Sequence, residues 1–314
     1  MHLRFGAAAF PEPDRAWLAA AERLPIDSVW HGGHILPPAH TGEAITRLAL
    51  MTAWTERVSV GAATLTLPLY HPVMLAKQLG DLDAHAGGRL RIGMGTGGEF
   101  PEEFAALGVP LAERASRTDE GMALMRRLWR GDPVSAAAGG HFPVQDAVLR
   151  LADLPGGKCP RPGGPPLYVS GRKGAAMRRA ARLGDGWMPY LLSSQAYARS
   201  VETIAAEAAL AGRDLVGFEW LMFLYCSIRA DGARARAEVA EFLGSAYGDK
   251  PPEMLARIAP AGTPDEVAPL FQAYVDAGVR HFIVAPAVRE DTLDVVRLAA
   301  EEVLPRLVLP DAAE

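Results

Sequence analysis

Four glycines, Gly93, Gly95, Gly97 and Gly98, punctuate the segment GGRLRIGMGTGGEFPEEFAA, residues 87–106, and an acidic stretch follows them. The apolar residues Leu90, Ile92 and Met94 lie in a short run bounded by glycines, which predicts a buried strand that ends in the glycine-rich turn. A backbone without Cβ atoms can adopt positive φ and lets a flat ligand approach closely. The segment therefore predicts a cofactor floor. The alternative is a set of glycines that only end a strand, because the spacing is not a strict GxGxxG.

Two histidines flank a pair of glycines in the segment Trp30-His31-Gly32-Gly33-His34, which follows another predicted strand. A histidine titrates near neutral pH and can transfer protons, so His34 is a candidate catalytic group. The alternative is a solvated loop residue. The spacing of His31 and His34 would suit a metal on a helix, but the glycines predict a loop and no third ligand is apparent, so we expect no metal site.

A third candidate is an anion site at residues 170–174. Here a predicted strand runs into a short turn and then into a helix, so that backbone amides are free to bind a phosphate. The charges of Arg172 and Lys173 would add to the attraction. The alternative is an ordinary turn with two solvated cations. The segment consists of Ser170, Gly171, Arg172, Lys173 and Gly174.

Strand and helix patterns alternate along the chain, which is typical of a parallel sheet covered by helices. Eight strands are about the number that closes a sheet into a (β/α)8 TIM barrel, and the first turn, residues 6–13, lacks the fingerprint of a dinucleotide-binding open sheet. We therefore predict a barrel, with the active site where the strands end. The predicted strands are 3–8, 26–30, 58–64, 89–94, 167–170, 186–189, 218–229 and 279–285.

The helices of this pattern are predicted at 13–23, 42–54, 73–85, 114–130, 175–182, 194–211, 231–247, 263–277 and 292–304. The alternation of strands and helices is interrupted at residues 131–164, a segment rich in proline and glycine. We expect one hairpin there, around 144–151. An α/β barrel can use this many residues as one domain, so residues 1–314 are predicted to form a single barrel domain with an insertion.

Composition narrows the classes of function. The 314 residues are 49% apolar and 22% charged and carry a net charge of -5, so no basic patch for nucleic acid is expected. No run of about 18 apolar residues is present, and the start of the chain has no leader pattern, which predicts a cytoplasmic protein away from membranes. Cys159 and Cys226 stand far apart outside any CxxC and are expected to be reduced thiols.

Three blocks of the sequence, and the order in which they occur, resemble those of the luciferase-like monooxygenase superfamily, the (β/α)8 flavin and deazaflavin oxidoreductases. The blocks lie within residues 1–230 and include LPIDSVWHGGH, GGRLRIGMGTGGEFPEEF and PPLYVSGRKG. The pattern EEF-x-x-x-GVP-x-x-x-R-x-x-R-x-DE, residues 102–120, is most similar to a branch that uses the deazaflavin coenzyme F420 instead of FMN.

The resemblance implies roles for individual residues. It places His34 beside the deazaflavin as a proton donor, although Gly33 stands where the family commonly has aspartate, which puts a sugar-phosphate reaction in doubt. It implies an acidic residue at Glu99, with Gly98 as the other choice for that position. A bulge with a nonproline cis peptide is implied at Ala63 and Thr64. The other implied cofactor contacts are Thr96 and Gly97 at the ring, and Ser170, Gly171, Arg172, Lys173 and Gly174 towards the phosphate.

The function that the resemblance implies is hydride transfer between the deazaflavin and a small organic substrate, with His34 and Glu99 as catalytic groups. One alternative is an FMN-dependent monooxygenase that uses reduced flavin and oxygen, served by a flavin reductase; the other is a noncatalytic barrel without cofactor. A homodimer is a further expected assembly. Four aromatic residues near strand ends are candidates for an apolar wall or for core packing, namely Trp30, Phe100, Trp187 and Tyr190.

Overall fold

A closed barrel of parallel strands forms the centre of the computed structural model, which describes residues 2–10, 12–37, 41–151 and 163–310. Neighbouring strands pair in parallel around the whole circle, and the pairings of β8 with β9 and of β11 with β1 close it. The predicted (β/α)8 barrel is therefore confirmed over the open sheet. The barrel strands are β1 (Arg4–Ala8), β2 (Ser28–Gly33), β3 (Ser59–Thr66), β4 (Leu90–Gly95), β7 (Leu167–Ser170), β8 (Gly186–Met188), β9 (Glu219–Ile228) and β11 (His281–Pro286).

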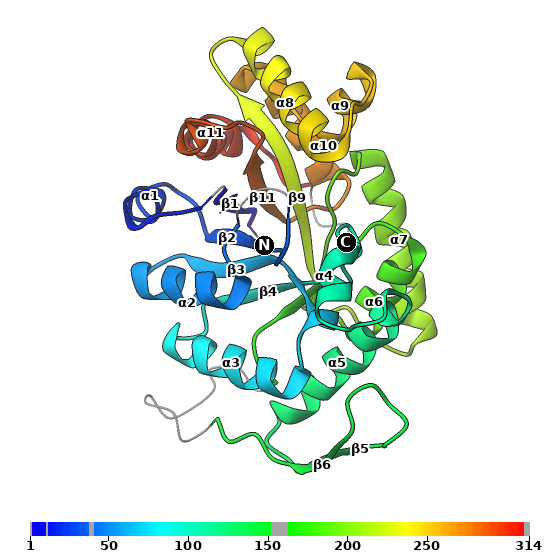
Figure 1. Cartoon of the computed structure of the whole chain (residues 1–314). Coiled ribbons are helices and arrows are strands. Elements are labelled where there is room, and N and C mark those ends of the chain that lie inside the picture. The colour runs from blue at the N-terminus through cyan, green and yellow to red at the C-terminus, as the bar shows by residue number, and fades with distance from the viewer. Residues whose placement is uncertain (1, 11, 38–40, 152–162, 311–314) are drawn as a thin grey trace.

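Helices surround this barrel (Figure 1). They are α1 (Arg15–Ala21), α2 (Ala44–Trp54), α3 (Pro72–His85), α4 (Pro101–Ala106), α5 (Arg114–Leu128), α6 (Gly174–Leu183), α7 (Ser194–Leu210), α8 (Gly232–Tyr247), α9 (Pro252–Ile258), α10 (Pro264–Asp276) and α11 (Thr292–Leu298). The short helices α4 and α9 were not predicted, because each has too few residues to show a helical period. Among the described residues, no helix has the length and apolarity needed to cross a membrane.

Two local predictions need correction. Strand β2 continues to Gly33 rather than ending at Trp30, because its backbone pairs with β3 as far as Leu65, across a shift in register. The hairpin of the insertion joins β5 (Val134–Ala136) to β6 (Val144–Ala147), so it begins before the expected 144–151. The hairpin lies apart from the barrel, next to α5, in Figure 1. Residues 152–162 of the insertion, with Cys159, lie outside the described residues.

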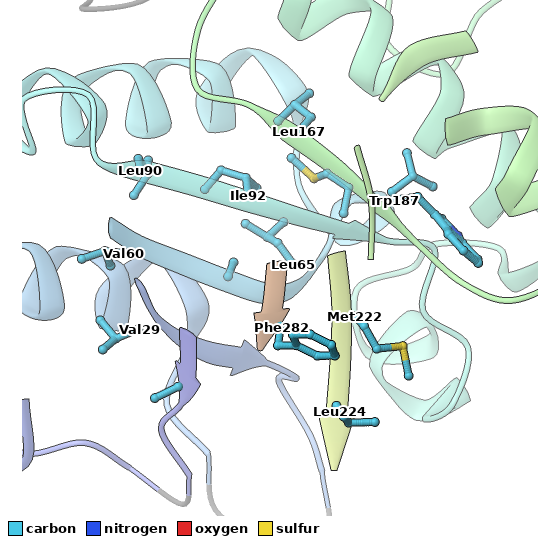
Figure 2. Packing of buried hydrophobic residues seen from close by; sticks show 14 of the residues in the cluster. Val29, Val60, Leu65, Leu90, Ile92, Leu167, Trp187, Met222, Leu224 and Phe282 are labelled. Carbon is cyan, nitrogen blue, oxygen red and sulfur yellow. The ribbon is translucent and has the colours of Figure 1, made fainter. Parts of the chain in front are cut away.

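The main core lies between the outer face of the barrel and the helices. Alternate residues of each strand point outwards, as the pleat requires, and pack against apolar helix faces. Figure 2 shows part of this core, including Ile92, Leu167, Trp187 and Phe282 from four different strands. Trp187 is fully buried, which settles it as a core residue.

Trp30 fills the inside of the barrel, in a second apolar cluster with Tyr168, Met188 and residues of β9 and β11. Its indole leaves no space at two glycines: a Cβ atom on Gly61 would lie 2.2 Å from Cε3 of Trp30, and one on Gly6 would lie 2.8 Å from Nε1. Gly93 likewise accommodates Met188, whose Cε atom would lie 2.3 Å from a Cβ there. Gly93 is thus a packing residue rather than part of the cofactor floor.

Polar side chains close the end of the barrel at which the strands begin. We call this end the floor of the barrel; it is distinct from the predicted cofactor floor. Arg4 forms an ion pair with Glu219 at 2.5 Å. Nε1 of Trp30 donates to Oγ of Ser28 at 2.8 Å, and a hydrogen bond of 2.9 Å joins Oγ of Ser28 to Nε2 of His281. Burial, with the nearby charges of Arg4 and Arg91, holds the pKa of His281 well below its ordinary value, so this histidine is neutral.

Candidate active site

The predicted site residues lie at or just after the carboxyl ends of four neighbouring barrel strands. Because all these strands run parallel, their carboxyl ends meet at one end of the barrel, which we call the mouth. His34 directly follows β2, residues 96–99 follow β4, and the turn 170–174 follows β7. The peptide between Ala63 and Thr64 lies within β3, near its carboxyl end. The fold thus gathers the predicted residues at one end, as expected for a barrel enzyme.

His34 lies between two carboxylates. Its Nε2 atom is 3.5 Å from Oε2 of Glu99, and its Nδ1 atom lies 3.2 Å from Oε2 of Glu103, within hydrogen-bond distance. The ring of Phe100 meets the imidazole edge-on, with ring centres 4.7 Å apart. Phe100 and Tyr190 are the two aromatic candidates left open by the core, and both contact the site, Phe100 at His34 and Tyr190 at Glu99.

Glu103 is the site residue that the sequence did not reveal. Its side chain is 0% exposed, against 45% for Glu99 and 31% for His34. The second oxygen, Oε1, accepts hydrogen bonds from the backbone amides of Ile35 at 2.5 Å and Leu36 at 3.0 Å. In the sequence, Glu102 and Glu103 look alike at the start of a helix. The only available signal was Phe104, whose apolar side chain indicates an inward face beside Glu103.

The electrostatics of the cluster favour the protonated form of His34. Burial alone lowers the pKa of His34, but the contacts with Glu99 and Glu103 and their charges outweigh it and raise the pKa above its ordinary value of about 6.5. The contact with His34 is the largest cause that lowers the pKa of Glu99. Both shifts favour an imidazolium between carboxylates. Such a group can act as a general acid near neutral pH and, after losing its proton, as a base.

Tyr190 joins this cluster to the predicted phosphate turn. Its hydroxyl donates to Oε1 of Glu99, and burial together with that carboxylate raises the pKa of the tyrosine. The guanidinium of Arg172 lies 4.9 Å from the centre of the Tyr190 ring and donates to the carbonyl of Leu191 at 2.9 Å. Arg172 is therefore held against Tyr190, whereas Lys173 is exposed at the start of α6.

At the mouth, the segments predicted to support the cofactor ring have the cis peptide and the positive φ angles that the sequence led us to expect. The peptide bond between Ala63 and Thr64 is cis, as the resemblance implied, and the pairing of β3 with both neighbours shifts register there. Gly97 and Gly98 have φ of 62° and 106°, in the region that favours glycine. Gly95 instead accommodates a side chain, because a Cβ on it would lie 2.7 Å from Oγ1 of Thr64.

The turn at 170–174 has the features that a phosphate group needs. Gly171 has φ of 120°, and α6 begins at Gly174 with no side chain capping its first amides. Residues 172–174 are exposed, so a ligand can reach those amides. A phosphate at this position would receive backbone donors, the positive end of the helix dipole and the charge of Lys173. The residues present therefore fit the phosphate side of a flavin-type cofactor.

The glycine at position 33 is a consequence of how α2 packs. A Cβ atom there would lie 2.6 Å from Cβ of Ala44 and 3.2 Å from the carbonyl oxygen of Thr64. An aspartate, which the family commonly has at this position, would not fit unless α2 moved. The departure from the family pattern is thus built into the packing of the mouth.

His31 is separated from this chemistry although it lies three residues from His34. Its Nδ1 atom is 2.9 Å from the carbonyl oxygen of Ala9, and its ring packs beside Phe10 with centres 5.4 Å apart. Burial lowers the pKa of His31, so the imidazole is neutral. Within the described ranges, no group of three or more histidine, cysteine or acidic side chains could hold a metal ion.

Two cavities lie away from these residues. One of about 350 Å³ lies between the amino-terminal parts of α2 and α3, and one of about 180 Å³ lies beside Trp17. Neither is lined by a predicted site residue. The site is therefore defined by the cluster at the mouth and not by these cavities.

Comparison with known proteins agrees with this architecture. A family model described as luciferase-like monooxygenase matches residues 11–250. The F420-dependent glucose-6-phosphate dehydrogenase of Beutenbergia cavernae is 31% identical, with 93% of this chain and 92% of that protein covered.

Solved structures share the fold. An F420-dependent secondary alcohol dehydrogenase in complex with an F420-acetone adduct has a TM-score of 0.81 at 19% identity, covering 96% of this chain and 98% of that one. Monooxygenase RslO1 from Streptomyces bottropensis has a TM-score of 0.80 at 26% identity, covering 96% and 99%. By its sequence, and in agreement with its fold, this chain belongs to the luciferase-like monooxygenase family.

Proposed function

We propose that this chain is an oxidoreductase that uses coenzyme F420 and acts on a small organic substrate. The observation that carries the proposal is the position of His34 between Glu99 and Glu103 at the barrel mouth, where both carboxylates raise its pKa. The relative from Beutenbergia cavernae, named as F420-dependent, supports the choice of cofactor. When bound, the deazaflavin would supply hydride transfer to or from carbon, and the protein would supply binding, orientation and the proton.

The residues of the mouth divide this work. The backbone at Ala63, Thr64, Thr96, Gly97 and Gly98 would support the ring, and the positive φ of Gly97 and Gly98 shapes the turn there. The turn 170–174 would bind the phosphate through the amides at the start of α6. Reduction of a carbonyl requires a proton for the oxygen, and His34 would donate it from Nε2; in the reverse direction the same atom would accept it. Glu99 would stabilise the charged imidazole.

A second candidate is an FMN-dependent monooxygenase. It is favoured by the structural likeness to monooxygenase RslO1, which at 26% identity is the more similar of the two solved structures in sequence. The same mouth would then bind a flavin in place of the deazaflavin, and a flavin reductase would be the expected partner. A cytoplasmic location, a homodimer and a single domain over residues 1–314 belong to the proposal as well.

Titration with the two cofactors tests the proposal. Coenzyme F420 and FMN are each added to the purified protein, and binding is followed by calorimetry and by quenching of the cofactor fluorescence. We expect micromolar or tighter binding of F420 and weaker binding of FMN. Copurification or tighter binding of FMN would replace the proposal with the monooxygenase, and binding of neither would leave a noncatalytic barrel.

A further inference from the structure

The two carboxylates that contact His34 differ in how firmly they are held. Glu103 has its whole side chain buried, and three nitrogen atoms contact it: Nδ1 of His34 and the backbone amides of Ile35 and Leu36. Glu99 is nearly half exposed, and 3.5 Å separates its nearest oxygen from Nε2 of His34. That distance exceeds an ordinary hydrogen bond, so Glu99 holds His34 loosely.

The firm contact determines which nitrogen of His34 keeps its proton. An ionised carboxylate can only accept hydrogen bonds, and Glu103 already accepts two from backbone amides that cannot turn away. The imidazole nitrogen facing it must therefore be a donor, because a bare nitrogen would put two lone pairs against each other. In a neutral imidazole only one nitrogen carries a proton, and the hydrogen bond of one nitrogen fixes the state of the other.

We propose that Glu103 is a positioning residue that keeps the proton of neutral His34 on Nδ1, so that Nε2 is the atom that exchanges a proton with the substrate. The reaction in which Nε2 takes part is the one proposed above, whereas the tautomer is a property of the protein without cofactor. Glu103 need not touch substrate or cofactor for this role.

Glu99 completes the arrangement as the exchangeable partner. Its other oxygen accepts from Tyr190, so Glu99 retains a hydrogen bond when it moves off Nε2. Phe100 lies edge-on against the imidazole and limits rotation of the ring, and so does the Nδ1 contact. A substrate oxygen can thus replace Glu99 at Nε2 while Glu103 holds the ring. Loss of the Nε2 proton removes the charge that attracts Glu99 and leaves the contact with Glu103 in place.

Nitrogen NMR of the unliganded protein tests this directly. Uniformly labelled protein is titrated from pH 5 to 10, and the His34 signals are identified by their loss in His34→Gln. We expect the neutral ring of His34 to show a protonated Nδ1 and an unprotonated Nε2. Observation of the opposite tautomer in the unmodified protein would overturn the proposal, whatever the variants do.

Matched variants separate the two carboxylates. Glu103→Gln keeps the size of the side chain but can present an amide donor to Nδ1, so we expect the tautomer to shift towards Nε2–H and the His34 titration to move to lower pH. Glu99→Gln should move the His34 titration to lower pH but leave the tautomer unchanged. Glu102 is exposed, and Glu102→Gln should change neither. An unchanged tautomer in Glu103→Gln, or an equal change in Glu99→Gln, would contradict the proposal.

A conservative variant covers the risk that Glu103→Gln folds poorly. Glu103→Asp retains the charge at a shorter reach and should restore the Nδ1–H tautomer that the glutamine variant loses. With a working substrate, the acid limb of the kcat profile should follow the His34 titration in each variant. If the tautomer behaves as expected but no F420-dependent turnover is found, the proposed function fails and the positioning by Glu103 stands.

Discussion

The mouth and the floor of the barrel each hold a histidine, and the two are in opposite states. His34 at the mouth contacts two carboxylates, which raise its pKa. His281 at the floor is fully buried, with Arg4 and Arg91 as its nearest charges, and its pKa lies well below the ordinary value. The same side chain is therefore favoured in its charged form at one end of the barrel and is a neutral packing group at the other.

The difference lies in access and in charge rather than in residue type. At the floor, His281 is buried together with Ser28 and Trp30, so its imidazole is shielded from a ligand. At the mouth, His34 and Glu99 stay partly exposed, and only Glu103 is sealed. A barrel of parallel strands thus separates stability from chemistry along its axis.

Substitution of His34 should have the largest effect, and it tests whether the proton transfer takes place at the mouth of the barrel. His34→Ala should lower turnover with F420 about 10²-fold or more, the effect expected for loss of a general acid, while cofactor affinity and melting temperature change little. Steady-state kinetics, calorimetry and thermal unfolding check these three quantities. A variant that turns over at the parent rate would show that the proton comes from Glu99 or water.

The interior next to the floor should respond in the opposite way, through stability. Gly61→Ala places a methyl group 2.2 Å from the rigid Trp30 ring and should lower the free energy of unfolding by about 1–3 kcal/mol. Denaturant unfolding measures this change. Gly139→Ala is the matched control, because no atom lies within 4 Å of a Cβ there, and its effect should stay within about 0.5 kcal/mol. Equal effects of the two substitutions would contradict the packing described for Trp30.

The phosphate turn offers a test of binding without chemistry. Replacing Arg172 and Lys173 together by alanine should weaken cofactor binding by about 1–3 kcal/mol, the range for charge-assisted hydrogen bonds, with little change in stability. Because Arg172 also holds Tyr190, Lys173→Ala alone should weaken binding without altering turnover of the bound enzyme. Arg182→Ala, at the other end of α6, is the control. Unchanged affinity in the double variant would place the phosphate elsewhere.

The smallest expected effect is the dependence of stability on pH, in which the two histidines differ in sign. The raised pKa of His34 contributes stability that is complete below about pH 6.5 and is lost as pH rises through the folded-state value. The lowered pKa of His281 removes stability as pH falls below about 6.5, because only the unfolded chain takes up the proton.

Unfolding at pH 5.5 and 8.5 therefore distinguishes them. Compared with the parent, His34→Gln should be relatively less stable at pH 5.5 than at 8.5, and His281→Gln relatively more stable at pH 5.5. The comparison of each variant with itself at two pH values cancels the packing cost of the substitution. The same sign for both variants would remove the contrast between mouth and floor.

The sequence by itself determined the barrel, because strand and helix periods are local patterns and eight repeats of them close a sheet. It also placed His34, residues 96–99 and the turn 170–174 at strand ends, and the glycines at 97 and 98 indicated positive φ correctly. The cis peptide before Thr64 followed from resemblance to the family and not from any local pattern. The hairpin was located imprecisely, since its short strands carry little periodic signal.

Only the tertiary structure decided which charged groups meet. Glu103 contacts His34 across 69 positions of sequence, and Tyr190 contacts Glu99 across 91. It also separated His31 from His34 and turned Arg172 towards Tyr190. Local periodicity shows which face of an element is buried, but not which partner will lie against it. Those pairings, and with them the protonation of His34, arise when closure of the barrel brings distant loops to one end.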